Sequence, residues 1–140
     1  MAAHCQPIST NSVKINESRR YGNEGRGIPN TIVQRIPHPG YDSFTTNNDF
    51  MLMKLQSPVT DSDISPLDLN MNGAVPANSD ALKVIGFGNL SFGGSSPTDL
   101  QEVDVQHVPT DECNGPSSYN GEILGETMLC AGVNGGGKDS

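Results

Sequence analysis

A histidine near the start of the sequence and an aspartate 45 positions later (49 minus 4), His4 and Asp49, are its residues best suited to catalysis. Imidazole takes up and returns protons near neutral pH because its ordinary pKa lies close to 7. A carboxylate on the other ring nitrogen fixes the tautomer, so the two groups can activate an attacking hydroxyl. Asp49 also has a structural interpretation, because aspartate is common in the turn before a strand. Orientation of a catalytic histidine is therefore one of two interpretations of Asp49.

A glycine-rich run at 132–138 ends in a lysine and is followed by Asp139 and Ser140. The run fits the first seven places of a phosphate-binding P-loop, whose eighth place must be Ser or Thr. Because Asp139 occupies that place and would repel a phosphate, we reject nucleotide binding. By itself, Asp139 is interpreted as a solvated loop acid.

The three cysteines, Cys5, Cys113 and Cys130, form an odd set without Cys-x-x-Cys spacing, and no His-x-x-x-His motif accompanies them. A zinc site built from them is therefore not expected. Glu17 and Glu24 could bind calcium through oxygen ligands, but nearby arginines make a solvated loop the better interpretation. We expect no metal and no cofactor.

The composition indicates an all-β protein, with 16 glycines and 10 prolines that separate short apolar runs in a chain of 140 residues. The formal net charge of -8 makes nucleic acid and anionic membranes poor partners. No apolar run reaches the roughly 18 residues that a membrane-spanning helix needs. These features leave an acidic β-rich domain as the expected class.

Alternation of polar and apolar residues, β-branched content and turn residues predict six strands. A short helix is expected from Thr110, which we interpret as its N-cap, and Gly115-Pro116 should end it. His107 falls on the polar phase of its strand and is expected to be exposed. Residues 56–80, rich in Pro, Asp, Asn and Ser, are interpreted as a connector. The expected strands are 12–16, 31–36, 50–55, 81–88, 100–108 and 128–132.

Several motifs in a fixed order are similar to those of one enzyme family. They are Ala-Ala-His-Cys at 2–5, Asp-Phe-Met-Leu-Met-Lys-Leu at 49–55, Gly-Phe-Gly at 86–88, Leu-Cys-Ala-Gly at 129–132 and Lys-Asp-Ser at 138–140. The chain thereby resembles the trypsin-like serine proteases of the chymotrypsin family over nearly its whole length. The order of His before Asp is that of this family and differs from that of the subtilisins.

The resemblance implies a double antiparallel β-barrel with both barrels incomplete in this chain. Residues 1–66 would form the later part of the first barrel with its connector, and residues 67–140 the earlier part of the second. Both would belong to one peptidase domain that is truncated at both ends. The resemblance also implies a disulfide between Cys113 and Cys130, with Cys5 left unpaired.

The same resemblance assigns His4 as the general base, Asp49 as its orienting partner and Asp139 as the residue that binds a substrate Arg or Lys. The implied activity is that of a secreted serine endopeptidase that cleaves after Arg or Lys in protein or peptide substrates. Protein protease inhibitors would be further partners. We expect the attacking serine and the oxyanion hole beyond residue 140, the export signal upstream, and the 140-residue chain to be inactive alone.

Two other functions remain open from the sequence. The first is a catalytically inactive protease homologue that acts as a binding or regulatory module. The second is an unrelated all-β adhesion or lectin-like domain. The serine position discriminates the enzyme from the inactive homologue, and a large separation of His4 from Asp49 would favour the unrelated domain.

Overall fold

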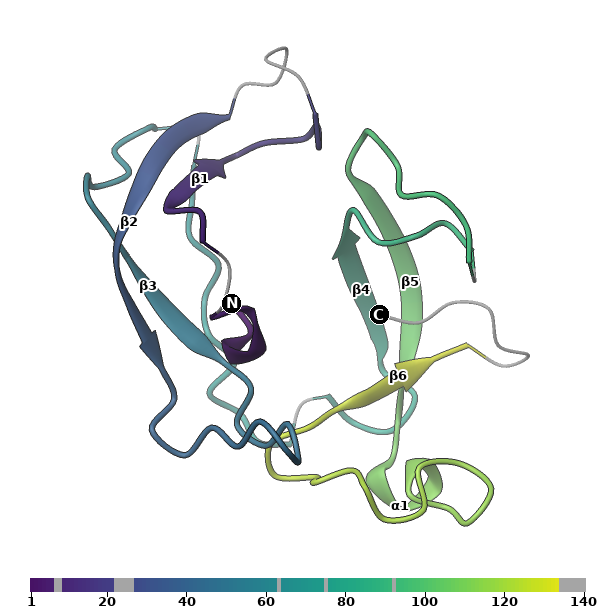
Figure 1. The fold of residues 1–140 in the computed structure, drawn as a ribbon. Helices are drawn as coiled ribbons and strands as arrows, with labels where there is room; N and C mark the ends of the chain where they lie inside the picture. Colours follow the sequence, from purple (N-terminus) through teal and green to yellow (C-terminus); the bar gives the residue numbers. More distant parts are fainter. Residues whose placement is uncertain (7–8, 22–26, 63, 75, 92, 134–140) are drawn as a thin grey trace. The chain divides into compact units, whose positions relative to one another are not determined.

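The computed structural model describes residues 1–6, 9–21, 27–62, 64–74, 76–91 and 93–133 of the chain. Strands are the main regular elements of these residues, which also contain one 3-10 turn and one short α-helix (Figure 1). The all-β prediction is therefore confirmed. Among the described residues, no helix has the length and apolar character needed to cross a membrane.

The chain divides into two compact units, which are described separately. The first comprises Met1–Glu17 and Arg26–Leu67, and the second comprises Ser18–Gly25 and Asp68–Ser140. The segment from Ser18 belongs to the second unit because its backbone is bonded there. The N–H of Leu100 donates to the carbonyl of Ser18 at 2.8 Å, and the N–H of Arg20 donates to that of Thr98 at 2.7 Å.

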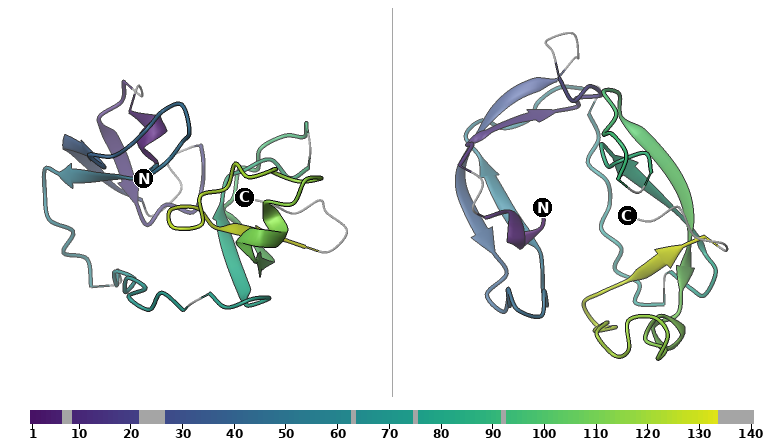
Figure 2. Two further views of the ribbon diagram at one scale, coloured as in Figure 1. Left: turned by 90° about the horizontal axis from the view of Figure 1, so that it is seen from below. Right: turned by 45° about the vertical axis from the view of Figure 1, so that its right-hand side comes forward.

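The first unit contains an antiparallel sheet with the strand order β1-β2-β3 (Figures 1 and 2). The strands are β1 (Ser12–Ile15), β2 (Ile28–Pro37) and β3 (Met51–Leu55). The register of β2 against β3 shifts between Ile32 and Gln34, as at a bulge. Ile32 and Met51 are buried and form part of the core with Ala3.

The second strand extends beyond the predicted range of 31–36 at both ends, so that Pro29 and Pro37, which flank that range, belong to the strand. Pro29 pairs with Lys14 of β1, and Pro37 pairs with Met51 of β3. Proline lacks an N–H and is tolerated where a strand has a partner on one side only. The strand β1 pairs with β2 up to Thr31, and β3 pairs with β2 from Ile32 onward, so each proline has a partner strand on one side only.

The second unit contains an antiparallel sheet with the order β4-β5-β6. The strands are β4 (Ala81–Gly86), β5 (Gln101–Val108) and β6 (Cys130–Gly132). Burial in β5 follows the predicted alternation, with Val105 only 2% exposed and both of its neighbours exposed. The alternation fails at the end of the strand. His107 is half-buried instead of exposed, with Nδ1 2.9 Å from the carbonyl oxygen of Ala77.

The short helix α1 (Thr110–Cys113) begins one residue earlier than predicted. Pro109 is the N-cap and Thr110 is already helical, so the assignment of Thr110 as N-cap is wrong. The Thr110 side chain instead lies against Gly125, where an added Cβ would come within 2.9 Å of the Thr110 hydroxyl oxygen. The helix ends before Gly115, as predicted from the Gly-Pro pair.

Candidate active site

The 3-10 turn η1 (Ala3–Cys5) carries His4 and lies beside the start of β3 in the first unit (Figure 1). Two backbone bonds hold it there. The N-terminal amine of Met1 donates to the Met51 carbonyl at 3.1 Å, and the Met51 N–H donates to the Met1 carbonyl at 2.6 Å. Ala3, the first residue of the turn, is fully buried. The start of the chain is thereby fixed against the strand that follows Asp49.

His4 and Asp49 meet through two hydrogen bonds. His4 Nδ1 lies 2.6 Å from Asp49 Oδ2, and the backbone N–H of His4 donates to Oδ1 at 2.8 Å. Both carboxylate oxygens are therefore engaged by one residue, which restricts rotation of the carboxylate. Because an ionised carboxylate only accepts, a neutral imidazole in this contact carries its proton on Nδ1 and leaves Nε2 free to act as a base.

The electrostatics keep the Asp49 carboxylate ionised at neutral pH. Its hydrogen bond with the His4 side chain, more than any other contact, holds the pKa of Asp49 below its ordinary value of 3.8. The Asp49 side chain is 19% exposed, whereas that of His4 is 61% exposed. The arrangement therefore combines a partly shielded anion with an imidazole that is open to a reactant.

Tyr41 lies in the same neighbourhood and was not among the predicted site residues. Desolvation raises the pKa of its hydroxyl, and the nearby negative charges of Asp49 and Asp42 and the Cys5 thiol raise it further. The Pro-Gly pair before Tyr41 predicts a turn, but no pattern in the sequence brings that turn near Asp49. Cys5 is a free cysteine.

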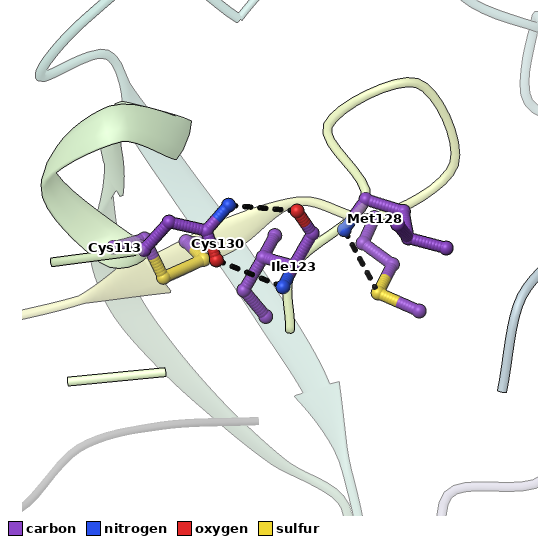
Figure 3. The surroundings of a disulfide bond; sticks show 6 residues. Cys113, Ile123, Met128 and Cys130 are labelled. Atoms are coloured by element: carbon purple, nitrogen blue, oxygen red, sulfur yellow. Dashed lines mark hydrogen bonds between the residues drawn. A yellow bond between two sulfur atoms is a disulfide. The ribbon is translucent and has the colours of Figure 1, made fainter. Parts of the chain in front are cut away.

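Cys113 and Cys130 are joined in a disulfide in the second unit, as the resemblance implied (Figure 3). The bond links the end of α1 to the start of β6, with a Cα–Cα distance of 6.5 Å. Asn114 reinforces the enclosed loop, because its side chain both donates to and accepts from the backbone of Ile123 at 2.8 Å. The Leu124 N–H also faces Met128 Sδ at 3.5 Å.

An open hollow of about 340 Å³ lies beside this disulfide. Its polar side chains are the hydroxyls of Ser118 and Tyr119. Its lining residues are Val108, Cys113, Ser118, Tyr119, Ile123, Leu129, Cys130 and Ala131.

Several predicted features lie outside the described residues. They are Asp139 with its substrate-binding role, most of the run that resembles a P-loop, and Glu24. Glu17 is described, and its carboxylate faces the Lys14 amine at 3.3 Å. Within the described part of the chain, no three His, Cys, Asp or Glu residues are grouped as a metal site requires.

Comparison with known proteins gives a consistent result. The family model described as Trypsin matches residues 1–140. The chain is 38% identical over 141 residues to Serine protease 1 of Rattus norvegicus, covering 99% of this chain and 55% of the relative. It is 36% identical over 132 residues to Trypsin alpha-4 of Lucilia cuprina, covering 93% and 51% respectively.

A third relative is Trypsin Blo t 3 of Blomia tropicalis, 35% identical over 144 residues, with 99% of this chain and 54% of the relative covered. The chain thus spans about half the length of the curated relatives it matches.

Proposed function

This chain belongs to the trypsin family, and from that premise we propose that it acts as part of a secreted serine endopeptidase. The observation that carries the proposal is the contact of 2.6 Å between His4 Nδ1 and Asp49 Oδ2, supported by the backbone bond of 2.8 Å. His4 is the general base in this proposal, and Asp49 is its orienting partner.

The proposed steps follow from this geometry. His4 Nε2 takes the proton of a serine hydroxyl as its oxygen bonds to the substrate carbonyl carbon, and later gives the proton to the leaving amine. Asp49 stays ionised, holds the Nδ1 proton and stabilises the imidazolium that forms. We propose that the serine and the oxyanion donors lie in sequence beyond Ser140, since the relatives are about twice as long as the matched region.

We further propose that Asp139 selects substrates with Arg or Lys at the cleaved bond. Its support is the Gly-Gly-Lys-Asp-Ser motif at 136–140 and the match to relatives named trypsin. A carboxylate at the base of a narrow pocket is stabilised by an arriving guanidinium or ammonium group. Substrates would be proteins or peptides, with protein protease inhibitors as further partners. The Cys113–Cys130 disulfide fits an oxidising compartment.

The test of catalysis uses the complete gene product and an arginine ester substrate. His4→Ala should lower kcat by about 10⁴-fold or more, because the base is lost. Asp49→Asn should lower it by about 10³ to 10⁴-fold through the wrong tautomer. His107→Ala is the matched control and should retain activity, because His107 Nδ1 contacts the Ala77 carbonyl and no carboxylate.

Two results would overturn the proposal. An inactive parent protein that fails to react with a fluorophosphonate probe would indicate the catalytically inactive homologue. An active His4→Ala variant would remove His4 as the base. For specificity, Asp139→Ser should abolish cleavage after Arg and Lys, and unchanged arginine-ester hydrolysis would contradict the role of Asp139.

A further inference from the structure

The loop between β2 and β3 contains Asp49 near its end and is closed by hydrogen bonds. The His38 N–H donates to the Phe50 carbonyl at 2.9 Å, which joins the two ends of the loop. Within it, the Asp42 N–H donates to the Asn47 carbonyl at 3.1 Å. The rings of His38 and Phe50 also contact each other, with centroids 4.6 Å apart. Asp49 is therefore held at one end of a loop that is closed by backbone bonds.

Asn48, the residue before Asp49, has three features that fix the chain at this point. Its backbone is left-handed, with φ of 53°. Its side-chain Nδ2 donates to the Gly40 carbonyl at 3.0 Å across the loop. Its own carbonyl accepts from the Phe50 N–H at 2.8 Å, which makes a three-residue turn with Asp49 at the centre.

The residue types suit this conformation. Asparagine tolerates the left-handed region better than most residues with a side chain, and its amide supplies the donor. The partner position needs a small residue, because a Cβ on Gly40 would lie 3.3 Å from Asn48 Nδ2 and 3.4 Å from the His38 ring. The Gly40 N–H also donates to His38 Nδ1 at 3.1 Å, which fixes the acceptor side of the contact.

The Asp49 carboxylate has little freedom to compensate for a shift of its backbone. One oxygen accepts the His4 backbone N–H at 2.8 Å and the other lies 2.6 Å from Nδ1. Satisfying both bonds at once requires one position and one rotation of the carboxylate. A change in the turn centred on Asp49 would therefore lengthen at least one of them.

We propose that Asn48 is a positioning residue. The hydrogen bond from its side-chain amide to the Gly40 carbonyl and its left-handed backbone together direct the Asp49 carboxylate toward His4. Its catalytic meaning rests on the proposed function, whereas its effect on the His4–Asp49 contact does not. Asn48 acts through Asp49 and has no place in proton transfer itself.

The experiment compares three variants with the unsubstituted complete gene product, called the parent. Asn48→Gly keeps access to positive φ and removes the side chain with its amide, while the added backbone freedom is matched by the control. Thr46→Gly is the matched control, because Thr46 is also left-handed, with φ of 58°, and lies exposed in the same loop. Gly40→Ala disturbs the amide contact from the acceptor side and serves if Asn48→Gly does not fold.

The first readout is the titration of the Asp49 carboxyl carbon by NMR. Its resonance is assigned with Asp49→Asn, since Asp42, Tyr41, Cys5 and His4 are charged or titratable groups nearby. The parent midpoint should lie below 3.8, as His4 dictates. Asn48→Gly and Gly40→Ala should raise it toward 3.8, while Thr46→Gly should leave it at the parent value.

The second readout is the His4 Nδ1 proton, which should exchange faster with solvent in Asn48→Gly than in the parent. Backbone amide protection in β3 should be retained, which separates positioning from general unfolding. An unchanged Asp49 midpoint and an unchanged ring proton in folded Asn48→Gly would overturn the inference.

The complete gene product separates this inference from the proposed function. There, Asn48→Gly should lower kcat about tenfold at unchanged KM, as expected for a misplaced orienting group. If Asn48→Gly shifts the Asp49 midpoint but the complete gene product has no protease activity, the inference is supported and the proposed function is overturned. If the gene product is active but Asn48→Gly leaves the midpoint unchanged, the proposed function is supported and the inference is overturned.

Discussion

The two units of this protein use similar sheets but join their distant segments by different bonds. In the first unit, the Met1–Met51 backbone pair and the His4–Asp49 contact connect the start of the chain to the beginning of β3. In the second unit, the Cys113–Cys130 disulfide connects α1 to β6. The candidate catalytic residues therefore lie in the unit whose described long-range connections are hydrogen bonds and packing instead of a covalent bond.

The second unit is connected in a way that neither acid nor salt removes. The disulfide closes a loop across 17 positions, and the Asn114 amide adds two bonds of 2.8 Å within it. The first unit lacks a disulfide among its described residues and relies on buried Ile32 and Met51. Different treatments should therefore weaken the two units separately.

The largest effect is expected from truncating the core beneath the candidate site. Met51 is the first residue of β3, two positions after Asp49, and is 2% exposed, whereas its neighbour Leu52 is 68% exposed. Met51→Ala should lower the free energy of unfolding by about 2 to 5 kcal/mol through lost burial and a cavity. The matched Leu52→Ala should cost well under 1 kcal/mol. Urea unfolding followed by circular dichroism measures both, and equal losses would contradict this assignment of the core.

A comparable effect in the second unit should follow from removing the disulfide. The double variant Cys113→Ser and Cys130→Ser should lose about 3 kcal/mol, because the unfolded chain gains the freedom of an open loop. Amide exchange measured by mass spectrometry should show lost protection at β6, with β1, β2 and β3 unchanged. Loss of protection at β3 in this variant would mean that the units are not independently stabilised.

A smaller and pH-dependent effect is expected in the first unit alone. The pKa of Asp49 is lower in the folded protein than its ordinary value of 3.8. Its contribution to stability is therefore fully present above that value, and it is lost as the pH falls through the lower folded pKa. Amide protection factors, which are corrected for the intrinsic pH dependence of exchange, should fall near η1 and β3 in acid, whereas those at β6 should not.

Asp49→Asn is the control for this acid effect, because an amide does not titrate there. Its amide protection factors near η1 should be the same above and below the Asp49 titration. Identical acid sensitivity of Asp49→Asn and the parent would assign the change to another carboxylate.

The smallest effect is expected at an exposed ion-pair cluster in the second unit. The Lys83 amine lies 2.8 Å from Glu102 and 3.3 Å from Asp104, but all three side chains are at least half exposed. The pKa of Lys83 is raised, first by its bond to Glu102, so this contribution is present below 10.5 and is lost at higher pH. Lys83→Met should leave Tm nearly unchanged at pH 7, with or without added salt. A salt-dependent drop in Tm would show that the cluster stabilises the sheet.

Local patterns predicted much of this structure. The polar–apolar alternation in 102–106 gave the burial of β5, because successive residues of a strand face opposite sides. The Gly115-Pro116 pair correctly limited α1. The misplaced features were those decided by neighbours in space, namely the ends of β2, the cap at Pro109 and the half-buried His107.

By itself, the sequence determined the all-β class through its residue types and the membership in the trypsin family through its motif order, and the resemblance to that family implied the pairing of Cys113 with Cys130. The tertiary structure alone decided how the His4–Asp49 contact is held. The two bonds of the Asp49 carboxylate require η1, which lies 45 positions earlier in the chain, to pack beside it. The hydrogen bond from Asn48 to Gly40 requires the closed loop between β2 and β3. No local pattern encodes such bonds, because they arise only when distant backbone segments are brought within hydrogen-bonding distance.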